Sequence, residues 1–275
     1  MDSANVDKIA FTGEYTTAQE IMRGAAGSLK RCTFECGGKS PLIVFDDADL
    51  ERTLRILVHS SFRSTGQSCS LASRIYVQRP AYDEVCRQVA QRAARIRVGD
   101  PFAPDTHIGP QTSAAQRDKS LSYIAYAEEH GMKRLCGGGP PSGLTRGYYV
   151  EPTVYADVDQ ASRLAQEEIF GPVLAMIPFD SEDEAVALAN DSRYGLVGGL
   201  FTRDLSRAHR VSAAIRCGLV SVNTFRPIHA ELPYGGFKLS GLGRENGLEV
   251  LREYTEIKSV VIDLDESIPP DPFGD

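Results

Sequence analysis

Residues 41–62 read PLIVFDDADLERTLRILVHSSF, and this stretch decides the fold class. Its first five residues are apolar and include β-branched side chains, a composition typical of a buried strand. The acidic residues at positions 46, 47 and 49 follow at once. Carboxylates at this place cap the free N–H groups of a helix N-terminus and favour the positive end of its dipole. The sequence therefore predicts a strand over residues 41–45 and a helix over residues 50–62.

The same alternation of strand and helix repeats along the chain. Comparable apolar runs occur at residues 8–12, 74–77, 173–178, 198–201, 218–222 and 258–264. Helical patterns cover residues 17–26, 81–95, 114–130, 182–190, 205–214 and 244–254. Strands that alternate with helices of about 10 to 15 residues indicate crossover connections. We therefore expect an α/β fold with a largely parallel sheet.

Composition and charge narrow the class of protein. The chain has 275 residues, 42% of them hydrophobic, and a formal charge of −7. A chain of this size can bury a large core. Because no basic stripe is present, nucleic acid is not an expected partner. No apolar run approaches the roughly 20 residues that cross a bilayer, and the acidic start lacks the basic region of a signal peptide, so we expect a soluble, cytoplasmic protein.

The six cysteines are too few and too scattered for a disulfide framework in a chain that can build a core. Cys32 and Cys36 lie four residues apart, but no second pair or nearby histidine completes a ligand set. We therefore expect reduced thiols and no metal site.

Two segments contain side chains that could react. Cys69 lies in a turn of small residues, where exposed backbone N–H groups near a helix end can lower a thiol pKa. A small buried cysteine without a catalytic role fits the same turn. Glu35 follows apolar residues and precedes two glycines, and a carboxylate there could have a raised pKa and act as a general base. A solvated Glu35 paired with Lys39 fits equally, so the local sequence leaves both roles open.

A third segment suggests a nucleotide contact without proving one. Glu168 precedes an aromatic residue and a Gly-Pro turn, so its carboxylate could accept hydrogen bonds from a ribose while Phe170 offers a flat wall. Solvation at a helix end explains the acidic residue equally well. The glycine-rich residues 234–243 lack the G-x-G-x-x-G spacing, so they predict no classical dinucleotide loop.

Five motifs, taken together and in order, resemble the aldehyde dehydrogenase superfamily. They are FTG at 11–13, ECGGKSP at 35–41, GQSC at 66–69, EEIFGPV at 167–173 and PYGGFKLSG at 233–241. The resemblance extends from about Val6 to Val261 and matches only the C-terminal part of the family's longer chain. The family's first portion of the nucleotide-binding domain has no counterpart here.

The resemblance implies roles for the reacting groups. Cys69 corresponds to the thiolate that attacks the aldehyde, and Glu35 to the base that activates a thiol or the hydrolytic water. Glu245 lies where some members have a carboxylate behind the base, which implies a proton relay. By the same resemblance, Tyr234 and Asn223 belong to the substrate pocket.

For the cofactor, the resemblance implies NAD(P), with Glu168 on the nicotinamide ribose and Phe170 and Gly13 beside it. Glu14, however, stands where the family commonly has a small serine, and its charge would repel the pyrophosphate. The family's oxyanion-hole asparagine and its adenosine contacts also belong to the portion without a counterpart. We therefore expect cofactor binding to be weakened or lost in this chain.

The resemblance also implies a domain organisation. Residues 1–41 are expected to be a remnant of the nucleotide-binding domain with part of its sheet, and residues 42–240 the catalytic domain with flanking helices on a parallel or mixed sheet. Residues 241–264 are expected to form a C-terminal helix and an oligomerisation strand, and residues 265–275 a flexible tail. A strand that extends a partner's sheet needs an open edge, so we expect a homo-oligomer.

Three functions remain open on this basis. The first is an aldehyde dehydrogenase-like enzyme that oxidises an aldehyde to an acid when a separate N-terminal half completes the nucleotide site. The second is a cofactor-independent thiol enzyme that acts on an ester or another acyl substrate by acyl transfer or addition. The third is a non-catalytic binding or assembly protein.

Overall fold

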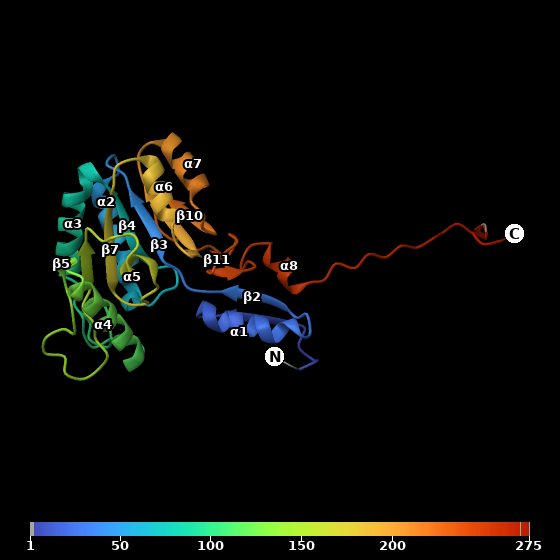
Figure 1. The fold of residues 1–275 in the computed structure, drawn as a ribbon, viewed down its shortest axis with the longest axis horizontal. Coiled ribbons are helices and arrows are strands. Elements are labelled where there is room, and N and C mark those ends of the chain that lie inside the picture. The colour runs from blue at the N-terminus through green and yellow to red at the C-terminus, as the bar shows by residue number, and fades with distance from the viewer. Residues whose placement is uncertain (1–2, 270, 275) are drawn as a thin grey trace.

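The computed structural model describes residues 3–269 and 271–274, and its main body is a seven-stranded mixed sheet (Figure 1). The strand order is β10-β9-β3-β4-β7-β6-β5. The strands are β3 (Ser40–Val44), β4 (Ala72–Gln78), β5 (Lys133–Cys136), β6 (Thr153–Ala156), β7 (Val173–Phe179), β9 (Val197–Phe201) and β10 (Leu219–Val222). All neighbours pair in parallel except β5 and β6. The predicted α/β class is confirmed.

Helices cover both faces of this sheet. On one face lie α2 (Leu50–Phe62) and α3 (Arg79–Ala93), and on the other α4 (Ala114–Glu129), α6 (Glu182–Asn190) and α7 (Leu205–Ala214). Strand β3 shows why both faces are covered. Leu42 and Val44 pack toward α2 and α3, whereas Ile43 joins the opposite core. Successive strand residues point to opposite faces, so a continuous apolar run needs helices on both.

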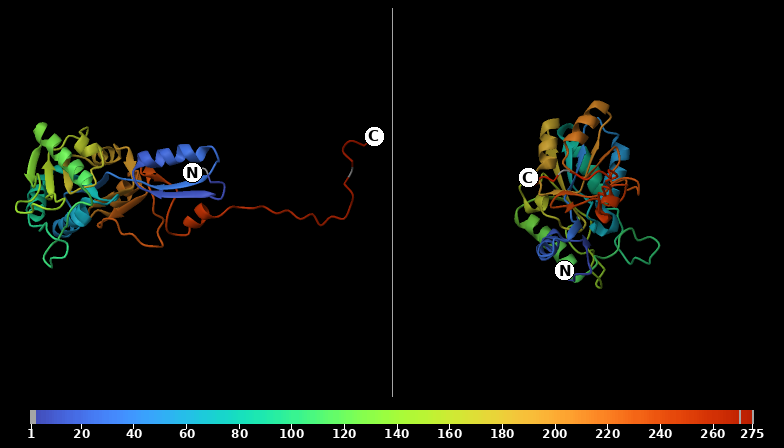
Figure 2. Two further views of the ribbon diagram at one scale, coloured as in Figure 1. Left: turned by 90° about the horizontal axis from the view of Figure 1, so that it is seen from below. Right: turned by 90° about the vertical axis from the view of Figure 1, so that its right-hand side faces the viewer.

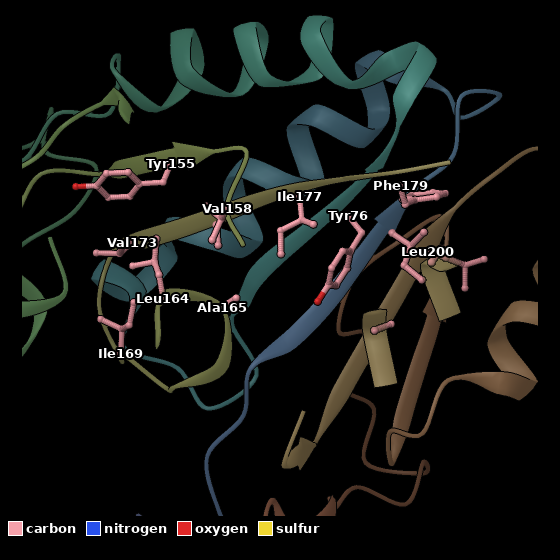
Figure 3. Close-up of a cluster of buried hydrophobic side chains, with 14 of the residues drawn as sticks. Tyr76, Tyr155, Val158, Leu164, Ala165, Ile169, Val173, Ile177, Phe179 and Leu200 are labelled. Atoms are coloured by element: carbon pink, nitrogen blue, oxygen red, sulfur yellow. The ribbon is translucent and has the colours of Figure 1, made fainter. Parts of the chain in front are cut away.

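Figure 3 shows the core on the face of α4, α6 and α7, where aromatic residues of three strands meet. Tyr76, Tyr155 and Phe179 are fully buried there. Phe45 and Phe179 pack edge to face, with ring centroids 5.4 Å apart. This contact fixes the C-terminal ends of β3 and β7 relative to each other.

A smaller sheet holds the N-terminal part of the chain and has the order β1-β2-β12. Its strands are β1 (Lys8–Thr12), β2 (Arg31–Glu35) and β12 (Gly241–Leu242), with α1 (Tyr15–Ala26) packed against it (Figure 1). Residues 36–39 link this sheet to β3 of the large one. The remaining short elements are β8 (Tyr194–Gly195), β11 (Phe237–Lys238), η1 (Arg63–Gly66), α5 (Arg163–Gln166) and α8 (Val250–Tyr254). The division at residues 41 and 240 stays a prediction.

The observed helices agree closely with the predicted ones, whereas several observed strands have no predicted counterpart. Helices α2, α6 and α7 have the predicted bounds, and α1, α3 and α4 differ by one or two residues. Asp49 caps α2 by accepting a hydrogen bond from the Arg52 N–H, as its position predicted. Strands β2 (RCTFE) and β5 (KRLC) are absent from the prediction because charged residues interrupt their apolar pattern, and β6 (TVYA) because it has only four residues.

One prediction near the C-terminus is wrong, and a second needs a partner chain. The helix expected over residues 244–254 is confined to α8, because Glu245 pairs with Tyr234 through backbone hydrogen bonds and residues 246 and 247 have positive φ. Residues 258–264 form no strand within the described chain; this segment is exposed and extends away from the body (Figures 1 and 2), and the predicted oligomerisation strand stays a prediction. It has no partner strand within the described chain, and a strand needs one. Of the predicted tail, residues 270 and 275 lie outside the described residues.

Within the part of the chain that the structure describes, every helix is too short or too polar to cross a membrane.

A buried arginine ties the link segment to the large sheet. Arg74 of β4 is 1% exposed, and its Nε donates to the carbonyl of Lys39 at 2.7 Å. Its Nη atoms donate to the Tyr76 hydroxyl and to the carbonyls of Ala189 and Asp191 at the end of α6. A cation at a helix C-terminus is stabilised by the carbonyl groups that lack helical partners.

We expect Arg74→Met to lower the free energy of unfolding by about 3 kcal/mol, because several buried carbonyls lose their donor. Urea unfolding measures this loss. Arg79→Met is the matched control, since Arg79 pairs with Asp180 on the surface and its loss should barely move the midpoint. Equal midpoints for the two variants would show that Arg74 does not hold this junction together.

Candidate active site

A cleft of about 520 Å³ opens where the two sheets meet, at the C-terminal ends of β1 and β2. It is lined by Thr12, Gly13, Glu14, Glu35, Cys36, Gly37, Gln67, Ser68, Cys69, Gln116, Lys119, Glu168 and Phe170. Five residues singled out from the sequence, namely Gly13, Glu35, Cys69, Glu168 and Phe170, therefore share one cleft. A larger hollow of about 610 Å³ beside α2 contains none of them, so it is not the candidate site.

Cys69 lies in the loop between η1 and β4 and is partly exposed. Its Sγ is 3.9 Å from the hydroxyl of Tyr234, the residue that the sequence assigned to the substrate pocket. The Cys69 carbonyl packs on Gly38, where an added Cβ would lie only 2.6 Å from it. Glycine is thus required at position 38 for the cysteine loop to approach the link segment.

The other thiols differ from Cys69 in their surroundings. Burial raises the pKa of Cys36, Cys86, Cys136 and Cys217 to about 11, so these groups stay protonated near neutral pH. Cys36 lines the cleft, but it also packs with Ala18 and Phe34 against α1.

Glu35 is the last residue of β2 and is 7% exposed. Burial and the nearby carboxylate of Glu245 raise the pKa of Glu35 to about 8, although the charge of Arg244 lowers it in part. Among the described residues, its Oε2 has no hydrogen-bond partner. The surface ion pair with Lys39 that the local sequence also allowed is not formed, because Lys39 is buried beside Arg74. Glu35 is therefore a buried carboxyl whose Oε2 has no hydrogen-bond partner within the described chain.

Glu168 reaches the cleft from the loop before β7. Its Oε1 accepts the N–H of Gly38 at 3.1 Å. A Cβ on Gly37 would lie 1.9 Å from the other carboxylate oxygen, so only glycine allows this approach. Burial raises the pKa of Glu168, which the Gly38 hydrogen bond and Lys119 partly oppose. Phe170 adopts a φ of 58°, and the Gln116 side chain donates to its carbonyl at 2.8 Å.

Ser240 supports the link segment 36–39, which follows Glu35. Sequence reasoning missed this role. Its buried hydroxyl donates to the Gly37 carbonyl at 2.7 Å and accepts the N–H of Gly195 at 2.9 Å. Its own carbonyl accepts the N–H of Cys36. The motif that contains Ser240 was recognised, but a serine among glycines gives no local sign of a contact 203 residues away.

Two other residues assigned from the sequence lie in supporting positions. Both polar atoms of the Asn223 side chain bind the backbone of Thr202, so this residue fastens the start of loop 223–233 to the end of β9. Glu245 exchanges two backbone hydrogen bonds of 2.7 Å with Tyr234, which sets Glu245 behind Glu35. Across the described ranges, no three His, Cys, Asp or Glu side chains form a group that could hold a metal ion.

A sequence profile described as the aldehyde dehydrogenase family matches residues 1–260. The chain belongs to this family. Betaine aldehyde dehydrogenases of Brucella melitensis and Brucella ovis are 46% identical to it over 259 residues, which are 94% of this chain and 53% of those proteins. The chain thus spans about half the length of the curated relatives it matches.

Solved structures of other family members agree with this fold. A betaine aldehyde dehydrogenase from Staphylococcus aureus in complex with NAD+ is 41% identical, with a TM-score of 0.88 over 90% of this chain and 50% of that one. An aldehyde dehydrogenase variant from Bacillus cereus is 38% identical, with a TM-score of 0.93 over 96% of this chain and 53% of that one. The α/β architecture is therefore that of aldehyde dehydrogenases.

We expect Cys69 to be the first thiol modified when iodoacetamide is limiting, because the pKa of Cys36, Cys86, Cys136 and Cys217 is raised to about 11, whereas Cys69 is partly exposed in the cleft. Peptide mass spectrometry after partial labelling gives the order of reaction. Cys32, which is also partly exposed but lies outside the cleft, is the internal control. Faster labelling of Cys36 or Cys217 would rule out Cys69 as the most reactive thiol.

The pKa of Glu35 also predicts a pH dependence of stability. Because it rises from 4.5 to about 8 on folding, the folded state binds this proton more tightly. The stability of the wild type relative to Glu35→Gln should therefore fall as the pH rises between these values. Urea unfolding of both proteins across this range measures the difference. Glu245→Gln removes one repulsive charge and should make the fall smaller; parallel curves for wild type and Glu35→Gln would contradict the buried carboxyl.

Proposed function

We propose that this chain carries the reacting groups of an aldehyde dehydrogenase, with Cys69 as nucleophile and Glu35 as base. The observation that supports this most is that one cleft contains a thiol, a carboxyl of raised pKa and the carboxylate of Glu168. These groups come from three separate segments of the chain. A cleft that gathers perturbed titratable groups is a good candidate for a catalytic site.

In the proposed reaction, the Cys69 thiolate adds to the carbonyl carbon of an aldehyde. The new C–S bond displaces the C=O π pair onto oxygen, as in other covalent catalysis by thiols. NAD(P)+, when bound, would take up the hydride and leave a thioester on Cys69. Glu35 would then accept a proton from the attacking water through its free oxygen. Collapse of the adduct breaks the C–S bond, releases the acid and restores the thiolate.

The residues of the cleft fit the nicotinamide end of such a cofactor. Glu168 would accept hydrogen bonds from the ribose hydroxyls, and Phe170 and the backbone at Gly13 line the same space. Gln116 and Lys119 add polar groups at this end. Glu14 also lines the cleft, and its charge would oppose a pyrophosphate there. We therefore infer that this chain binds the cofactor weakly unless other polypeptide completes the site.

Tyr234 and Glu245 would assist the two reacting groups. The Tyr234 hydroxyl lies near the Cys69 sulfur and would contact the substrate carbonyl region. Glu245 helps to keep the pKa of Glu35 high, and we infer that it relays the proton away from that base. Asn223 would act indirectly, by holding loop 223–233 at the pocket.

We infer a small aldehyde as substrate and a homo-oligomer as the functional form. Residues 257–264 expose Ile257, Val260, Val261, Ile262 and Leu264 on an extended segment. Such a row of apolar side chains supports addition to the sheet edge of a second copy. The six free thiols support a reducing location such as the cytoplasm.

The test is turnover of an aldehyde with NAD+ and, separately, of an activated ester. Glu35→Gln should reduce any turnover by about a hundredfold to ten-thousandfold, the usual share of general acid–base catalysis, and Cys69→Ala should abolish it. Arg146→Gln, a change on an exposed loop, is the control and should leave turnover unaltered. Each assay is repeated with any polypeptide that supplies the N-terminal half of the family's chain.

The outcomes separate the candidate functions. Reduction of NAD+ that needs Cys69 supports the dehydrogenase. Ester cleavage that needs Cys69 would favour the cofactor-independent thiol enzyme if no NAD+ is reduced, even when the N-terminal half of the family's chain is supplied. A folded protein that turns over neither substrate would favour a binding or assembly role.

A further inference from the structure

An arginine beside the catalytic cysteine has donors that nothing in its surroundings uses. Arg226 follows β10 in loop 223–233, and its Nη1 donates to the Ser68 hydroxyl at 2.8 Å. Ser68 directly precedes Cys69 and lines the reaction cleft. Tyr234, at the end of the same loop, approaches the Cys69 sulfur. This loop and the residue after it therefore bring a guanidinium to Ser68 and a phenol to Cys69.

The charge of Arg226 is not neutralised within the described chain. Its bond to Ser68 is its only side-chain hydrogen bond there, and it forms no ion pair. A guanidinium has five N–H donors, so most of them remain available. Glu231, the one carboxylate of the same loop, is exposed and does not pair with Arg226. Arg226 itself is only partly exposed.

The backbone of the loop is strained so as to hold this arrangement. Arg226 has a φ of 53° and Asn223 a φ of 54°, and both are non-glycine residues in the left-handed region. Such conformations are unfavourable for residues with a Cβ and gather at functional sites. The Asn223 side chain binds Thr202 at 3.0 and 2.9 Å, which fixes the start of the loop.

We propose that Arg226 determines the substrate class, and that the substrate is an aldehyde whose far end carries a carboxylate. The proposal rests on the assignment of Cys69 as nucleophile. A partly buried guanidinium with free donors favours a carboxylate, which it can bind through two parallel hydrogen bonds. It disfavours a cationic substrate. Betaine aldehyde, after which the Brucella and Staphylococcus relatives are named, carries a quaternary ammonium group and would be repelled.

The nearest acidic group of the mechanism does not cancel this preference. Glu35 is largely protonated near neutral pH because its pKa is about 8. Glu245 lies behind Glu35 and pairs with Tyr234 through its backbone. Arg226 therefore remains the charged group that touches the cysteine turn from the loop 223–233.

The test measures the charge preference at Cys69 without cofactor or turnover. Iodoacetate and iodoacetamide differ mainly in charge, and each alkylates the thiolate by forming a C–S bond as iodide leaves. The ratio of their rate constants at Cys69 should fall about tenfold in Arg226→Gln, because the anionic reagent loses its partner. Arg226→Lys keeps the charge and should keep most of the ratio. Arg146→Gln is the matched control and should not change it.

A second measurement uses aldehydes as protecting ligands. 4-Oxobutanoate, butanal and betaine aldehyde are compared as protectors of Cys69 against iodoacetamide, since each can form a reversible thiohemiacetal. In the wild type, 4-oxobutanoate should protect at about tenfold lower concentration than butanal, and betaine aldehyde should protect least. Arg226→Gln should remove this order. Circular dichroism confirms that each variant is folded.

Failure of the proposal differs from failure of the proposed function. If Arg226→Gln slows both alkylating reagents equally, Arg226 only holds Ser68 in place and the substrate assignment is overturned. An unchanged ratio overturns it as well. If Cys69 of the wild type is no more reactive toward iodoacetamide than Cys32, the proposed nucleophile fails first, whatever the ratio.

Discussion

The site depends on the close approach of one backbone segment to two others. Residues 36–39 pass from the small sheet to the large one, and Gly37 and Gly38 leave no space for a Cβ. On one side the Glu168 carboxylate fills that space, and on the other the Cys69 carbonyl does. A side chain at either position would push the Glu168 carboxylate or the Cys69 loop away from the segment that follows Glu35. The geometry of the cleft thus depends on glycine at both positions 37 and 38.

Such a close approach needs rigid support from the elements around it. Ser240 holds the Gly37 carbonyl, and Arg74 holds the Lys39 carbonyl through a hydrogen bond of 2.7 Å. The two supports lie 203 and 35 residues away in the sequence, so the segment is fixed by tertiary contacts and not by local structure. Buried polar groups that are fully bonded make a single arrangement of the backbone strongly preferred. Burial beside Arg74 also lowers the pKa of Lys39 to about 7, which reduces the cost of keeping two cations close.

The sequence predicted what local patterns control. Helices with caps and strands with continuous apolar runs appeared where expected, and the family motifs indicated five residues that line one cleft. Local patterns could not predict the short strands β2, β5 and β6, whose register depends on partners far away in the chain. They also could not find Ser240, Arg74 or Arg226, because each acts through hydrogen bonds to backbone or hydroxyl groups that lie far away in the sequence. The strand pattern of residues 258–264 stays a prediction, since this segment has no partner strand within the described chain and a second copy would have to supply one.

The charges around Cys69 are divided between two ends of the site. Glu14, Glu168 and Lys119 gather at the proposed cofactor end, while Arg226 contacts the cysteine turn from the loop 223–233. Glu35 lies between them with a pKa of about 8. Near neutral pH it is mostly uncharged, so it neither repels an anionic substrate nor competes with that substrate for Arg226. In the proposed reaction, the same burial that gives Glu35 its raised pKa would therefore also leave the charge of Arg226 available to an anionic substrate at Cys69.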